Sequence, residues 1–207
     1  MRLRKIFIGF LLILLVLPGC TRKSVDRKYY LIEPPEILPE DTTTIPPKFR
    51  EKFCVILPAR ISPQYNKHRI AVRTGEKELS YYVYHQWAVA PRDAFTRFVE
   101  LEVQNAHLFQ RAGTELWKYN PEFQISLDVS YLEVQMDGEK AIAHLAARLD
   151  LIRQFDQQPV VSHHFDRFQP LPRRNLNLFA VTVSQMFHEE LSLFIQKMRD
   201  WAGESEK

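Results

Sequence analysis

Residues 123–131 read FQISLDVSY, and their alternation predicts the fold class of this chain. Every odd position from Phe123 to Tyr131 is apolar or aromatic, whereas the even positions carry Gln, Ser and Asp. Because successive side chains of a strand point to opposite faces, one face is predicted to be buried and the other to meet water. A sheet that buries one face needs a second layer, so this stretch predicts a two-layer domain.

Strand signals continue on both sides of this stretch. Downstream, the turn dipeptide Asp137-Gly138 leads into an alternating segment at 141–155, and Gln157-Gln158-Pro159 leads into another at 160–168. The alanines of the first segment also suit a helix, but its two-residue period and the preceding turn favour a strand. Upstream, strands are predicted at 29–32, 53–57, 69–73 and 78–84, the last two forming a hairpin around a turn at 74–77.

Two amphipathic helices are predicted to form the second layer. The stronger signal follows Asn175 and runs to Trp201, with one continuous apolar stripe at helical spacing. An earlier helix is predicted from Pro91, a favoured first residue, up to Gly113. Together these elements predict an α+β fold, an antiparallel β-sheet with two α-helices packed on one face. Docking on a partner or on a membrane surface is the alternative use of the C-terminal helix.

The N-terminus has the layout of a bacterial lipoprotein signal. A basic head, MRLRK, precedes an apolar run at 6–17 that is too short to span a membrane. The run ends in Leu17-Pro18-Gly19-Cys20, which resembles a lipobox, so residues 1–19 are predicted to be removed by cleavage between Gly19 and Cys20. The alternative is a secreted soluble protein with a coincidental cysteine at this position.

Cys20 is the predicted point of attachment to a membrane. In lipoproteins with this signal the cysteine sulfur receives a diacylglycerol, and two or more acyl chains make anchoring stable. In similar lipoproteins an acidic second residue favours the inner membrane, so Thr21 favours the outer membrane, facing the periplasm. The covalent lipid on Cys20 is the only non-protein group that the sequence predicts.

Residues 20–52 are predicted to connect the anchor to the folded domain. A polar tether at 21–28 precedes the first strand, and the stretch from Pro34 to Pro47 holds five prolines. That density excludes a helix or a central strand and predicts an extended spacer. A proline-rich ligand for another domain is the alternative. The remaining residues, 53–207, suit a single domain.

Composition excludes several classes of function. The chain has 28 Lys and Arg, of which three lie in the signal, so 25 basic residues face 25 acidic ones in the mature protein. This balance predicts no nucleic-acid binding, which needs clustered positive charge. With Cys20 lipidated, Cys54 has no partner in the chain, and its place in an apolar strand predicts a buried free thiol.

No catalytic or metal-binding constellation is predicted. His163 and His164 are neighbours in a predicted strand, so they would point to opposite faces, and they are expected to be exposed rather than to bind one metal ion. Ser184 and Ser192 lie on a helix without the glycine turn of a hydrolase nucleophile. The chain is therefore predicted not to be an enzyme and to bind no cofactor.

Four aromatic residues that close the predicted hairpin are candidates for binding a partner. They are Tyr81, Tyr82, Tyr84 and Trp87, and tyrosine and tryptophan are common in binding hot spots. Alternation places Tyr82 and Tyr84 on one face and Tyr81 on the other. Because a one-sided sandwich cannot bury both faces equally, at least one aromatic is expected to be exposed. Trp87 suits the core better, and one of the tyrosines suits a contact surface.

Three motifs of the mature chain belong together. They are Tyr29-Tyr30-Leu31 after the predicted lipidated cysteine, the hairpin segment at 70–75 with Glu78-Leu79, and Tyr84-His85-Gln86-Trp87 before a predicted helix. With these motifs the chain resembles the ABC-type transport auxiliary lipoprotein family. The resemblance covers essentially the whole mature chain. It implies a non-catalytic accessory of an envelope lipid transporter.

The resemblance also implies partners. In such systems an inner-membrane permease is joined to periplasmic proteins with mammalian-cell-entry (MCE) domains, and the lipoprotein docks on that assembly from the outer membrane. Two other functions remain open, which are assisting a β-barrel protein during outer-membrane biogenesis and carrying lipid in an internal cavity. Self-association into a homo-oligomer is compatible with each of them.

Overall fold

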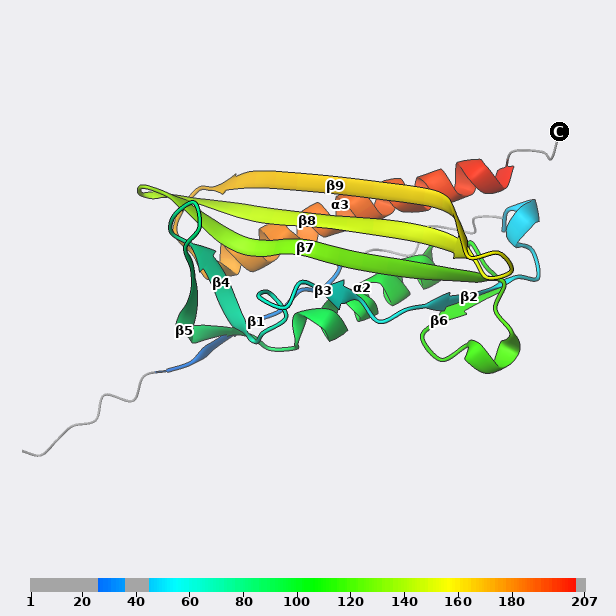
Figure 1. The fold of residues 1–207 in the computed structure, drawn as a ribbon, viewed down its shortest axis with the longest axis horizontal. Coiled ribbons are helices and arrows are strands. Elements are labelled where there is room, and N and C mark those ends of the chain that lie inside the picture. The colour runs from blue at the N-terminus through cyan, green and yellow to red at the C-terminus, as the bar shows by residue number, and fades with distance from the viewer. Residues whose placement is uncertain (1–25, 36–44, 204–207) are drawn as a thin grey trace, which may run out of the picture.

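A meander of three long strands forms the centre of the sheet. In the computed structural model, which describes residues 26–35 and 45–203, these strands are β7 (Phe123–Asp137), β8 (Lys140–Arg153) and β9 (Gln158–Leu171). Each pairs antiparallel with the next along nearly its whole length (Figure 1). The first turn places Gly138 at a φ of +57°, which glycine adopts without strain. The predicted meander is confirmed.

Shorter strands line the other edge of β7 one after another. Within the described residues the sheet has nine strands, and those that pair with this edge run parallel to β7. The predicted hairpin at 69–73 and 78–84 forms, and its second strand extends to Trp87. The sheet is therefore mixed rather than antiparallel throughout. The short strands are β1 (Lys28–Tyr30), β2 (Phe53–Ile56), β3 (Arg60–Ile61), β4 (Arg69–Arg73), β5 (Leu79–Trp87) and β6 (Arg111–Gly113).

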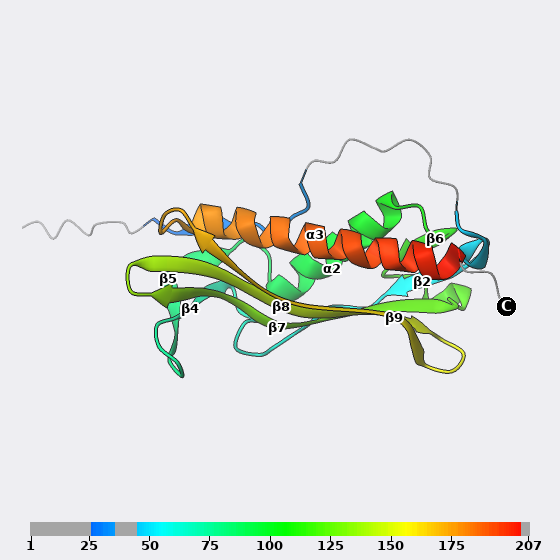
Figure 2. The ribbon, with the colours of Figure 1, turned by 90° about the horizontal axis from the view of Figure 1, so that it is seen from above.

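Two α-helices cover one face of this sheet, as predicted. Figure 2 shows α2 (Pro91–Asn105) and α3 (Leu176–Gly203) on the same side, with α3 running the length of the meander. The side chain of Asn175 accepts hydrogen bonds from the backbone N–H groups of Asn177 and Leu178, at 2.8 and 3.3 Å, and so caps the start of α3. Two single-turn 3-10 helices, Pro47–Phe49 and Trp117–Tyr119, lie in the connections.

The first helix ends earlier than the sequence predicts. It stops at Asn105, and His107 has a left-handed φ of +48°. The chain then forms β6, which pairs parallel with β2. The prediction of a helix up to Gly113 is wrong in its last part, because Leu108 and Phe109 are buried from an irregular segment and only imitate helical spacing.

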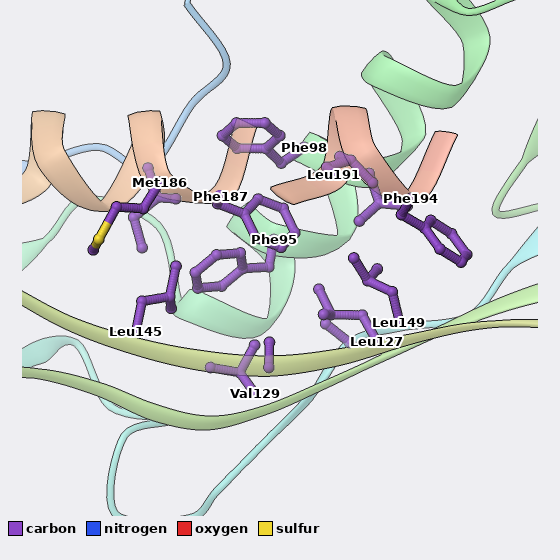
Figure 3. Packing of buried hydrophobic residues seen from close by; sticks show 14 of the residues in the cluster. Phe95, Phe98, Leu127, Val129, Leu145, Leu149, Met186, Phe187, Leu191 and Phe194 are labelled. Carbon is purple, nitrogen blue, oxygen red and sulfur yellow. The ribbon is translucent and has the colours of Figure 1, made fainter. Parts of the chain in front are cut away.

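Aromatic side chains fill the space between the helices and the sheet. The Phe187 ring of α3 meets Phe95 and Phe98 of α2 edge to face, with ring centroids 4.8 and 4.9 Å apart. Leu145 and Leu149 of β8 point toward them from the sheet (Figure 3). The apolar stripe predicted for α3 is buried along this seam, which confirms its role as the second layer.

Residues that precede position 53 also pack into this unit. β1 pairs with β5, Ile32 is buried, and the Phe49 ring lies 4.3 Å from that of Phe109. Most of the predicted proline-rich spacer, at 36–44, lies outside the described residues, as do Gly19 and Cys20. Among the described helices, none has the length and apolar character needed to cross a membrane.

Candidate docking surface

The face of the meander opposite the helices carries polar and aromatic side chains. We call it the outer face. A register shift in β7 between Val129 and Tyr131 reverses the alternation, so that Tyr131 and Glu133 point outward while Leu132 points into the core. The expectation that Tyr131 shares the buried face with Phe123 is therefore wrong, and the β-bulge is the reason.

Glu133 is the centre of a hydrogen-bonded cluster on the outer face. Its carboxylate accepts hydrogen bonds from Tyr65 Oη at 2.6 Å and from Arg73 Nε and Nη2 at 2.7 and 2.9 Å, and it lies 3.2 Å from His144 Nδ1. The Glu133 side chain is fully buried although no helix of the described residues covers this face. Burial alone would raise the pKa of Glu133, but the hydrogen bonds from His144, Arg73 and Tyr65 lower it to about 2.

The His144 imidazole extends this cluster across the sheet. Its Nε2 atom lies 2.9 Å from a carboxylate oxygen of Asp166 on β9. Its ring is stacked between Tyr131, at 4.4 Å, and Phe168, at 4.0 Å. Because Phe168 remains 54% exposed, the stack presents an aromatic ring to solvent on this face.

The candidate aromatics of β5 have separate environments. Between the pairs Arg69↔Gln86 and Ala71↔Tyr81, one residue of β4 faces four of β5, so residues 82–85 leave the β4–β5 ladder as a wide bulge. On its other side His85 still pairs with Lys28 of β1. This bulge makes Tyr84 46% exposed, together with its neighbour Val83.

The other three candidates are more enclosed. Tyr81 donates a hydrogen bond to the carbonyl of Gln64, and Tyr82 is half-buried. Trp87 is 2% exposed and packs against Phe179, so it belongs to the core and is not accessible to a partner. The structure thus separates the four residues instead of forming one site, and Tyr84 is the one with the largest accessible ring.

The cysteine, histidine and serine residues considered in the sequence contribute to the fold. Cys54 is fully buried, as predicted, and burial raises the pKa of its thiol. His163 and His164 face opposite sides, but His163 is buried, which corrects the expectation that both are exposed. It lies 2.7 Å from Glu190 of α3 because that helix covers its side of the sheet. The Ser192 hydroxyl donates to a carbonyl one turn earlier.

Sequence reasoning did not find the Glu133 cluster. A charged residue between two apolar ones, Leu132-Glu133-Val134, is the only local signal for it. Within the described residues no group of three or more His, Cys, Asp or Glu side chains has an arrangement that could hold a metal ion.

These features define a two-layer α+β domain with one helix-covered and one open sheet face. Residues 31–190 match a family model described as the ABC-type transport auxiliary lipoprotein component. The chain belongs to this family, which confirms the resemblance seen in the sequence. The general function of the family is that of a lipoprotein that assists an ABC-type transport system.

Two solved structures share the fold. Protein XCC0632 from Xanthomonas campestris is similar with a TM-score of 0.61 and 17% identity, covering 78% of this chain and 95% of its own. An uncharacterized protein is similar with a TM-score of 0.65 and 9% identity, covering 84% of this chain and 99% of its own. At these identities the likeness concerns the fold alone. Among curated proteins, no sequence matches the chain.

Proposed function

We propose that this protein is a non-catalytic adaptor, anchored by a lipid on Cys20 to the periplasmic face of the outer membrane, that docks on the MCE-domain component of an envelope lipid transporter. The observation that carries the proposal is the family match over residues 31–190. The Leu17-Pro18-Gly19-Cys20 motif supports the anchor, and Thr21 supports the outer membrane as its destination.

The exposed aromatic bulge of β5 is the contact surface in this proposal. Tyr84 and Val83 are 46% and 57% exposed on adjacent positions. Aromatic side chains that can be desolvated are frequent anchors of protein interfaces. The bulge lies beside β1, which begins eight residues after Cys20 in the sequence.

The anchor is tested by replacing the cysteine. Wild-type protein is expected to incorporate radiolabelled palmitate and to sediment with outer-membrane vesicles on a sucrose gradient. The Cys20→Ser variant is expected to incorporate no label and to remain as the longer precursor. Equal labelling and equal electrophoretic mobility of the two proteins would overturn the anchor.

The contact surface is tested by photo-crosslinking in the native bacterium. A photoreactive phenylalanine analogue is placed at Tyr84 or, as a matched control, at Phe155, an exposed aromatic in the turn at the other end of the meander. The Tyr84 probe is expected to yield an adduct with the MCE-domain protein, and the Phe155 probe none. An adduct with a β-barrel protein and with no transporter component would contradict the adaptor and favour the biogenesis function.

A further inference from the structure

A pocket of about 430 Å³ lies where β1, β5, the β7–β8 hairpin and the start of α3 meet. We call it the tether-side pocket. Val134, Ala141 and Leu171 line it with apolar atoms, and all three are buried. Lys28 and Arg174 line the same pocket with positive charge. Pockets that combine apolar walls with a few polar groups are typical of sites for small molecules.

The charge of this pocket is one-sided. Its lining contains no Asp or Glu, and within the described residues neither Lys28 nor Arg174 forms a salt bridge. Arg174 Nη2 donates a hydrogen bond to the carbonyl of Gly138 at 2.8 Å, which holds the guanidinium beside the hairpin turn. A planar guanidinium held in this way suits a phosphate or carboxylate oxygen pair.

Two other hollows of the described surface lack this character. A hollow of about 390 Å³ beside β6 is lined by both Glu100 and Arg111, so its charges are mixed. A groove of about 410 Å³ along α3 is lined by Glu33 and by no Lys or Arg. The positive lining thus distinguishes the tether-side pocket from these two hollows.

Hydroxyl and imidazole groups complete the polar part of the pocket. Tyr30 Oη lies 2.7 Å from His85 Nδ1, and the Tyr82 ring meets the His85 ring edge to face at 5.7 Å. Burial raises the pKa of both Tyr30 and Tyr82, so both phenols stay protonated near neutral pH. The two phenols are thus neutral hydrogen-bonding groups next to the two cations of the pocket.

One residue of the pocket closely follows the predicted membrane attachment in the sequence. Lys28 follows Cys20 by eight residues, and a fully extended chain of that length spans at most about 28 Å. Residues 21–28 contain Arg22, Lys23, Arg27 and Lys28 against the single acid Asp26. Basic residues next to a membrane are attracted to anionic lipid headgroups. The nearness to a membrane rests on the anchor proposed above, whereas the composition of the pocket does not.

We propose that the tether-side pocket binds a phosphate group, carried either by an anionic phospholipid headgroup or by a small soluble phosphate ester. Arg174 and Lys28 bind the phosphate oxygens, and the apolar wall accepts the glycerol or the first part of the chain attached to it. The adaptor would in this way hold lipid headgroups in addition to touching protein partners.

Calorimetric titration of the full mature protein in a nonionic detergent tests this proposal. The probes are short-chain dihexanoyl phosphatidylglycerol, glycerol phosphate and inorganic phosphate. Saturable binding is expected, and Arg174→Gln and Lys28→Gln are each expected to weaken it at least tenfold. Arg173→Gln is the matched control, since Arg173 is exposed, adjacent in sequence and absent from the pocket lining. The Arg173→Gln variant is expected to change the affinity for each probe less than twofold.

The outcomes separate the two sources of phosphate. Binding of the lipid probe alone assigns the pocket to headgroups, and equal binding of glycerol phosphate assigns it to a soluble ester. Equal losses in the Arg173 and Arg174 variants, or no saturable binding of any probe, would overturn the proposal. If Arg174→Gln unfolds the hairpin turn, Lys28→Gln decides, because Lys28 makes no side-chain hydrogen bond among the described residues. The assay contains no transporter component, so its failure is distinct from failure of the crosslinking test.

Discussion

The two faces of the β7–β8–β9 meander are stabilised by different means. On the inner face, Leu145 and Leu149 are buried by the aromatic side chains of two helices. On the outer face of the same strands, Glu133 is equally buried, but its neighbours are Tyr65, Arg73 and His144. The inner face has a second layer of secondary structure, whereas the outer face excludes water with a few side chains and the loop that holds Tyr65.

The two faces are therefore expected to respond differently to pH and to mutation. Apolar area and close packing stabilise the inner face, and this apolar contribution does not depend on pH. Shortening a large side chain there lowers the free energy of unfolding. Outer-face stability comes from a carboxylate that must remain ionised and fully hydrogen bonded. A surface that stays ordered without a covering layer is available for contact, as the proposed adaptor function requires.

Shortening a central inner-face ring is expected to have the largest effect. Phe187→Ala removes a fully buried ring that contacts both Phe95 and Phe98. The expected loss in the free energy of unfolding is about 3–5 kcal/mol, since a phenylalanine cavity in a packed core closes only partly. Urea denaturation followed by circular dichroism measures it.

Leu193→Ala is the control for this prediction. Leu193 lies on the same helix and is 53% exposed, so its truncation is expected to change stability by no more than about 0.5 kcal/mol. A similar loss in both variants would mean that α3 is weakened by lower apolar content in general and not by a cavity at the inner face.

Neutralising the outer-face carboxylate is expected to have the next largest effect. Glu133→Gln keeps the shape of the side chain but leaves the Arg73 guanidinium without its counter-charge. The expected loss is about 2–3 kcal/mol at pH 7, typical of removing one partner from a buried charged hydrogen bond. Asp137→Asn, an exposed change on the same strand, is the control and is expected to be nearly neutral.

Lowering the pH should reduce the difference in the free energy of unfolding between wild type and Glu133→Gln. The pKa of Glu133 is lowered from an ordinary 4.5 to about 2, so the ionised form stabilises the fold above pH 4.5. That contribution, roughly 3 kcal/mol by linkage, is lost as the pH falls from 4.5 toward 2. Other acids with lowered pKa values, such as Glu122 and Glu189, affect both proteins alike. A stability gap that stays constant from pH 6 to pH 3 would show that the charge of Glu133 is not what stabilises the outer face.

Local period explains which parts of the fold could be predicted from the sequence. The strands of the meander have long repeats of two residues, broken in β7 by the bulge at Ser130, and α3 has a repeat of about 3.6 residues. The sequence predicts both elements with approximately the observed bounds. The parallel pairing of β2, β3 and β4 depends on which edge of β7 each strand reaches, and no local pattern encodes that choice. β3 and β6 have two and three residues, too few to show any period.

The candidate sites were harder to predict for a related reason. A single bulge at Ser130 reverses which residues of β7 face outward, so a period of two assigns Tyr131 to the wrong side and conceals the partners of Glu133. The tether-side pocket brings together Lys28 and Arg174, which are far apart in the sequence. Exposure of an aromatic on β5 was predictable from the surplus of tyrosines, but the wide bulge that selects Tyr84 was not.

The smallest expected effect tests whether the aromatic stack adds to the outer face. Phe168→Ala removes a ring that is 54% exposed and stacked 4.0 Å from His144, so the expected loss is about 1 kcal/mol. Phe155→Ala, which truncates a ring that is 94% exposed, is the matched control and is expected to cost nothing measurable. Equal stability of the two variants would mean that the charged cluster alone orders this face. A loss as large as that of Phe187→Ala would mean instead that the outer face is a second apolar core, and the contrast between the two faces would not hold.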